Sequence, residues 1–223
     1  MNRPVIIINF KNYEEILGHG AVRLATVAEE ACRAIPVDLI LAPPVPTLSE
    51  VAKATRVPAF SQGVVDGQEG KSTGAVIPEA LKAAGCSGSI VNHSESRVSV
   101  EMVRRLLPRM QKLGLSSCVC AQDGAEAAEM ARLAPEFVAV EPPELIGSGI
   151  AVSRARPELL QDALSSVRRT GYKGKLLCGA GIVTGEDVRE ARRLGMEGVL
   201  VASSVVKAKD WAARVRELAA SLV

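Results

Sequence analysis

Short apolar runs recur along the chain, and a segment with helical spacing follows each of them. Most of the runs are continuous, without polar alternation, which is typical of parallel strands covered on both faces. The predicted strands are Pro4–Asn9, Val37–Ala42, Val57–Ser61, Gly88–Asn92, Ser116–Cys120, Glu136–Val140, Gly174–Gly179 and Gly198–Ala202. Eight strand and helix units favour an α/β fold, a closed (β/α)8 barrel that forms a single domain over residues 1–223, with an open doubly wound sheet as the alternative.

Residues that start helices lie between the predicted strands. Thr47 with Glu50, and Asp123 with Glu126, have the spacing of capping boxes. Thr184 is predicted to start a later helix. One further helix has an apolar stripe at spacings of three and four residues, made by Val103, Leu106, Leu107, Met110 and Leu113. These signals support strands and helices that alternate along the chain.

Composition narrows the functional classes. Lys and Arg number 27 against 25 Asp and Glu, so no strong field favours nucleic acid or an acidic membrane surface as a partner. No apolar run approaches the ~18 residues of a membrane span, and the amino terminus lacks the features of a signal peptide. Five cysteines without a CxxC pair fit a reducing compartment. We therefore expect a cytoplasmic protein, with Cys118 and Cys120 as small core residues and no metal site.

A carboxylate at the end of one predicted strand is the first candidate for catalysis. The apolar run Phe137–Val140 is short and rich in β-branched residues, so it is predicted to be a buried strand with Glu141 at its carboxyl end. That end of a strand faces the ligand in α/β proteins. Pro142–Gly149 has prolines at one end and glycines at the other, which favours a hinged lid. Glu144 lies within this loop, where we expect a lid contact and not a base.

The other strand ends supply the remaining candidates, because barrel chemistry gathers where the strands end. The polar residues after the first and fourth strands are Asn9, Lys11, Asn92, His93, Ser94 and Glu95. Small residues follow the seventh and eighth strands, at Gly179–Gly181 and Ala202–Ser204. Exposed backbone amides in such segments can approach an anion.

These segments, taken in order, resemble the triosephosphate isomerase family, and the short chain is similar to its compact archaeal-type branch. The matching segments are Asn9–Lys11, Asn92–Glu95, Glu141–Gly149, Gly179–Ile182 and Val199–Ser203. The resemblance implies a TIM barrel that acts as an aldose-ketose isomerase in glycolysis and gluconeogenesis. Such an enzyme interconverts dihydroxyacetone phosphate and D-glyceraldehyde 3-phosphate without cofactor or metal.

The resemblance also implies a role for each residue. Glu141 would take a proton from carbon, and His93 would polarise the substrate oxygen as the electrophile. By the mechanism known for this family, a helix amino terminus beside His93 keeps the imidazole neutral. Lys11 would supply positive charge, and Asn9 would orient Lys11 or His93. The residues implied to hold the phosphate are Gly147, Gly181, Ala202 and Ser203, with Ile146 closing over the ligand.

The segments depart from the commoner family pattern at the phosphate site. Cys178–Gly181 replaces a tyrosine, two glycines and a serine, so only the amide of Gly181 remains for the ligand. Ser204 is bulkier than the glycine expected in the compact branch. The loop Gly63–Gly74 resembles one that inserts beside a neighbouring subunit's site, which implies a homo-oligomer, with a tetramer favoured over a dimer.

Two other functions stay open at this stage. The second class is another phosphate-binding barrel enzyme, either an aldolase, in which Lys11 would form a Schiff base, or a different sugar-phosphate isomerase. A catalytically silent barrel that serves as a binding scaffold is the third class. The presence of Lys11, His93 and Glu141 together at strand ends argues against the scaffold.

Overall fold

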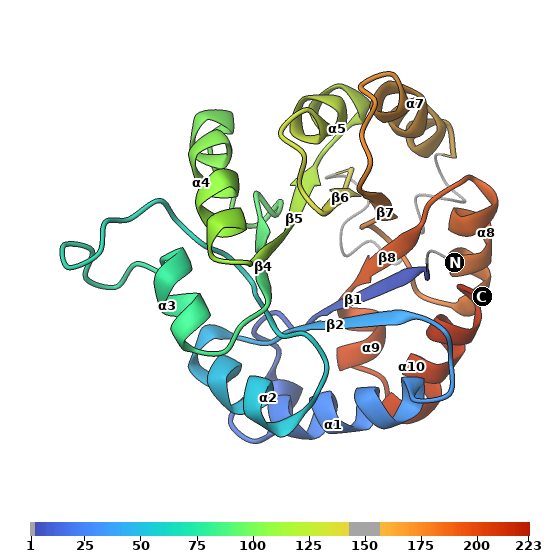
Figure 1. Cartoon of the computed structure of the whole chain (residues 1–223). Helices are drawn as coiled ribbons and strands as arrows, with labels where there is room; N and C mark the ends of the chain where they lie inside the picture. The colour runs from blue at the N-terminus through green and yellow to red at the C-terminus, as the bar shows by residue number, and fades with distance from the viewer. Residues whose placement is uncertain (1–2, 143–156) are drawn as a thin grey trace.

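The computed structural model describes residues 3–142 and 157–223, in which parallel strands form a barrel surrounded by helices (Figure 1). The strands are β1 (Val5–Asn9), β2 (Asp38–Ala42), β3 (Phe60–Ser61), β4 (Gly88–Val91), β5 (Ser116–Ala121), β6 (Phe137–Val140), β7 (Lys175–Cys178) and β8 (Gly198–Val201). β1 pairs with both β2 and β8, and each strand from β4 to β8 pairs with the strand before it. A bridge between Leu41 and Ala59 joins β2 to β3 and closes the ring. The predicted (β/α)8 barrel is confirmed, and the open doubly wound sheet is wrong.

β3 is the strand that differs most from its prediction. The expected strand Val57–Ser61 is reduced to Phe60–Ser61, preceded by the single bridge at Ala59. Pro58 has no N–H and cannot donate to a ladder, although its carbonyl accepts a hydrogen bond from the Leu41 amide at 3.0 Å. The proline therefore shortens the strand at the point where the barrel closes.

Helices follow the strands and form the outer ring. The helices are η1 (Glu14–Ile16), α1 (Gly20–Cys32), η2 (Val45–Thr47), α2 (Leu48–Ala54), α3 (Pro78–Ala83), α4 (Val100–Lys112), α5 (Gly124–Ala131), α7 (Pro157–Arg168), α8 (Gly185–Arg193), α9 (Ser203–Val206) and α10 (Trp211–Ala220). α10 packs on α1, so the first and last helices close the ring (Figure 1). No described helix is long and apolar enough to cross a membrane.

The predicted helix starts have different outcomes. Asp123 caps α5, since its side chain accepts a hydrogen bond from the Glu126 amide at 2.9 Å. The capping box predicted at Thr47 is wrong. Its residues 45–47 form the turn η2, and the Thr47 hydroxyl donates to the carbonyl of Pro44 at 3.2 Å. A hydroxyl directed back into the preceding turn leaves the amides of α2 uncapped.

Alternate strand positions fill the barrel interior. The buried interior residues are Val5, Ile7, Ile40, Ala42, Phe60, Ile90, Cys118, Cys120, Phe137, Ala139, Leu177 and Leu200. The positions between them pack against the helices. Cys118 and Cys120 are thus core residues, as predicted. The described residues contain no group of three or more His, Cys, Asp or Glu side chains that would hold a metal ion.

The same alternation places polar side chains at the carboxyl end of the barrel. Glu141 follows Ala139 by two residues along β6, and Asn9 follows Ile7 by two residues along β1, so both continue an inward-facing row. The row along β7 continues from Leu177 to a glycine, which leaves space beside the carboxylate. The alternation of side chains along the strands therefore directs polar residues to the carboxyl end of the barrel interior.

Candidate active site

One cavity at the carboxyl ends of the strands brings together residues predicted from five separate segments. Its lining includes Asn9, Lys11, His93, Glu141, Gly179, Ala180, Gly181, Ile182, Ala202, Ser203 and Ser204. The first four come from β1, β4 and β6 or the residues just after them, and the others come from the ends of β7 and β8. The cavity therefore joins a cluster of ionisable groups to two segments of small residues.

Glu141 is buried at the end of β6, with 3% of its surface exposed. Its amide donates to the Ala121 carbonyl at 2.7 Å, which continues the β5–β6 ladder and fixes the backbone. Oε1 lies 3.4 Å from His93 Nε2, while Oε2 has no hydrogen-bond partner among the described residues. Burial raises the pKa of this carboxyl above its ordinary value, and its polar neighbours, first His93 and to a smaller extent Lys11, oppose part of that rise. A carboxylate in this environment is a stronger base than one in water.

His93 presents one particular nitrogen to the cavity. The amide of Glu95 donates to Nδ1 at 3.1 Å, so Nδ1 accepts and carries no hydrogen in that arrangement. The hydrogen of a neutral ring then sits on Nε2, the nitrogen that faces Glu141. The helix expected directly after His93 is wrong, because α4 begins only at Val100 and a turn follows the histidine. A single amide in that turn selects the tautomer.

Lys11 has a backbone conformation that non-glycine residues rarely adopt, with φ at 48°. Its own amide donates to Asn9 Oδ1 at 3.0 Å, and its carbonyl accepts from Gln62 Nε2 at 3.0 Å. Strain of this kind costs about 1–3 kcal/mol and persists only where neighbours enforce it. Nζ lies 2.7 Å from Glu95 Oε1, and 17% of the lysine side chain is exposed. The ammonium is held at the cavity by contacts at both ends of the residue.

The segments after β7 and β8 contain small residues, which lets their backbone lie close to the cluster of Lys11, His93 and Glu141. Gly179 lies so close to Glu141 that an added Cβ would be 2.5 Å from the glutamate Cγ. Gly181 has φ at 71°, a conformation that favours glycine. Ala202 and Ser203 meet at the start of α9, and the Ser204 hydroxyl is buried without a hydrogen-bond partner among the described residues. Small residues therefore bring the backbone close to the cavity on this side, beside apolar residues such as Ile182 and Leu200.

Two contributing residues were missed by the sequence reasoning. Gln62 binds the carbonyls of Lys11 and Ala42, and its position just after the third strand was the available signal. Cys120 lies in the barrel interior beneath Glu141, and the contact with Cys118, followed by burial, raises the pKa of its thiol. Alternation along β5 points to that interior position, but nothing in the local sequence identifies its neighbour.

Part of the predicted site lies outside the described residues. Ile146 and Gly147, expected over the ligand, and Glu144, expected as a lid contact, fall within residues 143–156. Pro142, the first residue of the predicted lid, is described and buried.

Comparisons with known proteins converge on one family. A family model described as "Triosephosphate isomerase" matches residues 4–218. A protein named triosephosphate isomerase from Cenarchaeum symbiosum (strain A) is 48% identical over 220 residues, which cover 98% of each chain. Proteins of the same name from Caldivirga maquilingensis and Methanocaldococcus jannaschii are 44% and 38% identical, over 100% and 96% of this chain and 99% and 98% of theirs.

Proposed function

The chain belongs to the triosephosphate isomerase family, and from this premise we propose how its residues divide the work of the reaction. The chain is an aldose-ketose isomerase of glycolysis that needs no cofactor and takes triose phosphate as substrate. Interconverting dihydroxyacetone phosphate and D-glyceraldehyde 3-phosphate moves a carbonyl between adjacent carbons. That change requires a base for a carbon-bound proton and a donor for the enediolate oxygen.

Glu141 is the base in this proposal. The observation that carries the assignment is its buried carboxylate, whose pKa is raised by burial and whose Oε1 lies 3.4 Å from His93 Nε2. The unpartnered Oε2 leaves one oxygen available for a substrate proton. Because the carboxylate is mounted on a strand, little motion separates it from the position in which it reacts.

His93 donates a hydrogen bond from Nε2 to the substrate oxygen as negative charge develops there. The Glu95 amide on Nδ1 supports this direction, because a nitrogen that accepts on one side of a neutral ring leaves the other to donate. Lys11 adds fixed positive charge beside the same oxygen. A donor and a charge aimed at the developing oxyanion lower the barrier more than they stabilise the neutral substrate.

Lys11 acts through its charge and not as a Schiff-base nucleophile. Its Nζ forms an ion pair with Glu95 Oε1 at 2.7 Å, in which the lysine takes part as an ammonium. A protonated amine has no lone pair with which to attack a carbonyl. The ion pair therefore gives no support to the aldolase alternative, and the assembled cavity gives none to a silent scaffold.

The substrate phosphate is held by backbone amides of Gly181, Ala202 and Ser203. Their support is that all three line the cavity that also contains the catalytic cluster, on the strand ends where barrel phosphate sites are common. Gly147, with Ile146 over the ligand, remains the predicted contribution of the lid.

Replacing the base tests this division of roles. Glu141→Gln keeps the shape of the side chain but cannot accept the proton, so turnover in a coupled assay with D-glyceraldehyde 3-phosphate should fall by about a thousandfold or more. KM should change far less. Glu144→Gln is the matched control, because this loop carboxylate is not expected to take the proton. Near-normal turnover in Glu141→Gln would make the assignment wrong.

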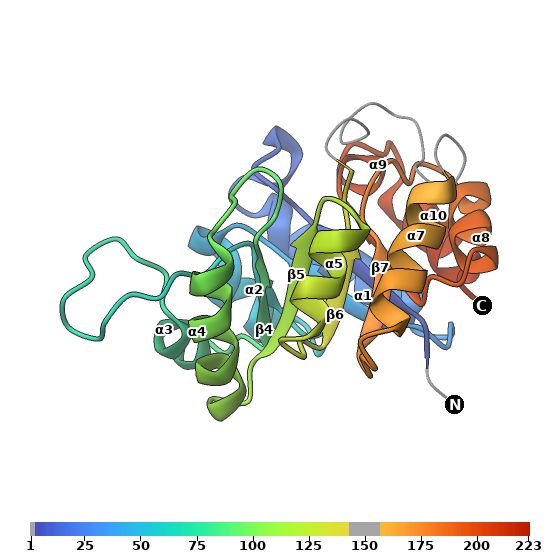
Figure 2. The same cartoon turned by 90° about the horizontal axis from the view of Figure 1, so that it is seen from above.

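A homo-oligomer, with a tetramer favoured over a dimer, is the second part of the proposal. The loop between β3 and α3 extends away from the barrel (Figures 1 and 2). Arg109 of α4 donates to the loop carbonyl of Gly67 at 2.8 Å and to Asp66 at 3.1 Å, so the loop is held in shape before any association. A preformed loop loses less freedom on binding.

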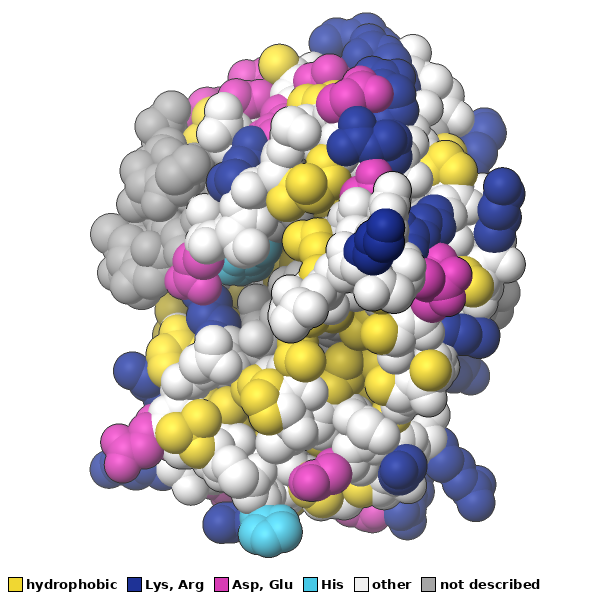
Figure 3. Space-filling view, turned by 90° about the vertical axis from the view of Figure 1, so that its left-hand side faces the viewer, with side chains coloured by type: hydrophobic (Ala, Val, Ile, Leu, Met, Phe, Trp, Pro, Cys, Tyr) yellow, Lys and Arg dark blue, Asp and Glu magenta, His cyan; other side chains and the backbone are white. Residues whose placement is uncertain are grey.

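The surface beside this loop has features that suit contact with a second copy of the chain. Apolar side chains gather in a hollow on the face that carries the loop (Figure 3). A cavity of about 650 Å³ there is lined by Val45, Val64, Val65, Val76, Val91 and Val98, and it reaches Lys11 and His93. Val45 is 46% exposed, which is unusual for a large apolar residue. Covering the hollow would shield the site from water on that side.

Light scattering tests the assembly. The wild-type chain should elute with the mass of a tetramer, and Val45→Asp should dissociate it because a buried charge disfavours the contact. Val223→Asp is the control, since Val223 is 70% exposed and does not line the hollow. A monomeric wild-type protein would refute the proposal.

We further propose that residues 1–223 form one domain and that the protein works in the cytoplasm. The five buried free cysteines support the cytoplasmic location.

A further inference from the structure

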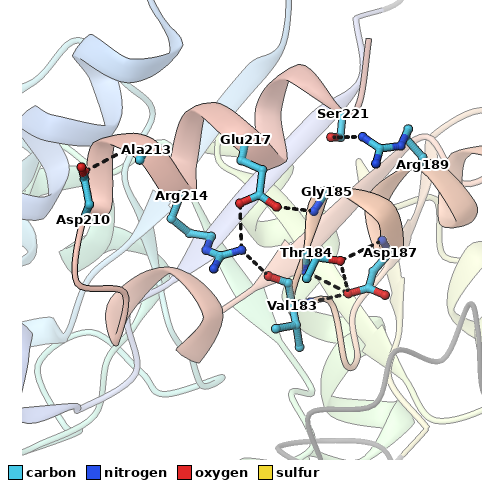
Figure 4. Close-up of polar contacts among 10 residues, drawn as sticks. All are labelled: Val183, Thr184, Gly185, Asp187, Arg189, Asp210, Ala213, Arg214, Glu217 and Ser221. Carbon is cyan, nitrogen blue, oxygen red and sulfur yellow. Dashed lines mark hydrogen bonds and ion pairs between the residues drawn. The ribbon is translucent and has the colours of Figure 1, made fainter.

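The backbone just after the Gly181 segment is bound by side chains of α10 (Figure 4). Arg214 Nη1 donates to the carbonyl of Val183 at 2.9 Å. Glu217 Oε1 accepts from the amide of Gly185 at 2.7 Å, and its other oxygen pairs with Arg214 at 2.9 Å. An ion pair from one helix thus contacts both a carbonyl and an amide of residues 183–185, which we call the clamped segment.

α8 holds the clamped segment from the other side. Asp187 Oδ2 accepts from the amides of Val183 and Thr184 at 3.1 and 2.8 Å, and Thr184 and Asp187 complete a capping box. The helix start predicted at Thr184 is therefore confirmed. Gly185 permits close approach, because an added Cβ would be 2.4 Å from the Oγ of Ser221, which follows α10. The clamped segment is wedged between two helices.

The first turn of α10 also holds the other segment of small residues. Trp211 Nε1 donates to the carbonyl of Val206 at 2.9 Å, and Val206 ends α9, which starts at Ser203. Lys207, next in sequence, lies over the ring of Tyr13 with Nζ 4.7 Å from the ring centroid. α10 therefore contacts both the segment after β7, which carries Gly181, and α9, which begins at Ser203.

We propose that Arg214 and Glu217 are positioning residues for phosphate binding, because together they set where the Gly181 amide lies relative to those of Ala202 and Ser203. This inference rests on the phosphate contacts proposed above. Amides bind an anion well only when they converge on it, and Gly181 lies two residues before the clamped segment. The pair itself is partly exposed, at 29% and 44% of the two side chains, so its contribution to folding stability is small. Its main effect is on the position of the Gly181 amide.

The helix interface offers a matched control. Arg189 of α8 donates to the Oγ of Ser221, the residue that follows α10, at 3.0 Å and to Glu186 Oε2 at 2.6 Å. It therefore links the same two helices as the clamp, but through side chains. Arg189→Met removes an arginine from the same interface that is more exposed, at 58% against 29% for Arg214, whereas Arg214→Met removes one that binds the clamped backbone.

Three measurements separate positioning from general damage. In Arg214→Met and Glu217→Ala, KM for D-glyceraldehyde 3-phosphate and the inhibition constant of inorganic phosphate should both rise by about tenfold, as expected when binding groups are displaced. Proton exchange into phosphate-free glyceraldehyde, followed by NMR, should stay within about twofold of wild type because that substrate makes no phosphate contact. Glu217→Gln retains an oxygen for the Gly185 amide and should recover part of the loss.

The outcomes that would overturn the inference are distinct. Phosphate inhibition and KM in Arg214→Met equal to those in Arg189→Met would show that the clamp does not position the ligand. A parallel fall in glyceraldehyde exchange would show that the pair supports the whole site instead of its phosphate side. If inorganic phosphate fails to inhibit the wild-type enzyme while isomerase turnover is normal, the phosphate contacts proposed above are wrong, and the clamp inference falls with them.

Discussion

A single methyl group added at Gly179 should disable the base without touching it chemically. Gly179 follows β7 and lies directly against the side chain of Glu141, which follows the neighbouring strand β6. In Gly179→Ala the new Cβ would be 2.5 Å from Glu141 Cγ and 3.2 Å from the carbonyl oxygen of Val140. Ordinary contact begins at 3.4 Å, so the carboxylate must retreat by about 0.9 Å. The Val140 carbonyl, which accepts from the Gly179 amide at 2.9 Å, limits how far the backbone can yield instead.

The expected loss follows from that displacement. A misplacement of about 1 Å in a catalytic group costs roughly a hundredfold in rate, so kcat of Gly179→Ala should fall by about that factor. KM should change by less than about threefold, because Glu141 is not expected to bind the ground state. Overpacking of this kind destabilises a fold by about 1–3 kcal/mol, which lowers the melting temperature but leaves the protein folded.

A coupled assay with D-glyceraldehyde 3-phosphate, combined with thermal unfolding, measures both effects. Gly63→Ala is the control, because an added Cβ at Gly63 meets nothing within 4 Å and the backbone there needs no glycine torsion. The control should keep normal kcat. If Gly179→Ala is folded and retains wild-type kcat, then the exact position of the Glu141 carboxylate does not limit the reaction, and the reasoning fails.

Two further predictions concern the same cluster. Gln62→Ala removes the hydrogen bond to the Lys11 carbonyl and lets that residue relax from its left-handed torsion, so kcat/KM should fall by about tenfold in steady-state assays; an unchanged kcat/KM would mean that Asn9 alone holds Lys11. The melting temperature of Glu141→Gln, relative to that of the wild type, should increase as pH rises. The raised pKa means that folded Glu141 binds its proton more tightly than the unfolded chain does, so wild-type stability declines from the ordinary carboxyl value of 4.5 up through the folded pKa. Melting temperatures from pH about 4 to about 8 test this, and parallel curves for the two proteins would contradict it.

The parts of the fold that follow from local pattern were predictable. Continuous apolar runs located the strands, and the period of two carried Glu141 and Asn9 inward at their ends. The shortening of β3 also has a local cause, because Pro58 cannot join a ladder. The error at Thr47 came from a competing turn, since its hydroxyl donates to the carbonyl of Pro44 and does not cap α2.

Contacts between distant segments were not predictable from pattern. Gln62 reaches Lys11 across 51 positions, and Arg214 reaches Val183 across 31, with no periodicity to link them. The neutral tautomer of His93 was expected from a helix that does not begin there, and one turn amide takes its place. Sequence reasoning identified the groups that meet at the cavity, but packing chose the neighbours that fix them.

The interior residues beneath Glu141 make the packing of the core relevant to the evolution of the turnover rate. Cys120 and Ala139 form the layer on which the carboxylate rests, and both are completely buried. A substitution in that layer changes catalytic geometry before it threatens the fold, because tightly packed side chains transmit displacement. Selection for turnover would therefore discriminate among core sequences of equal stability. A library varied at these two positions and sorted by activity would enrich the residue sizes that best support the base.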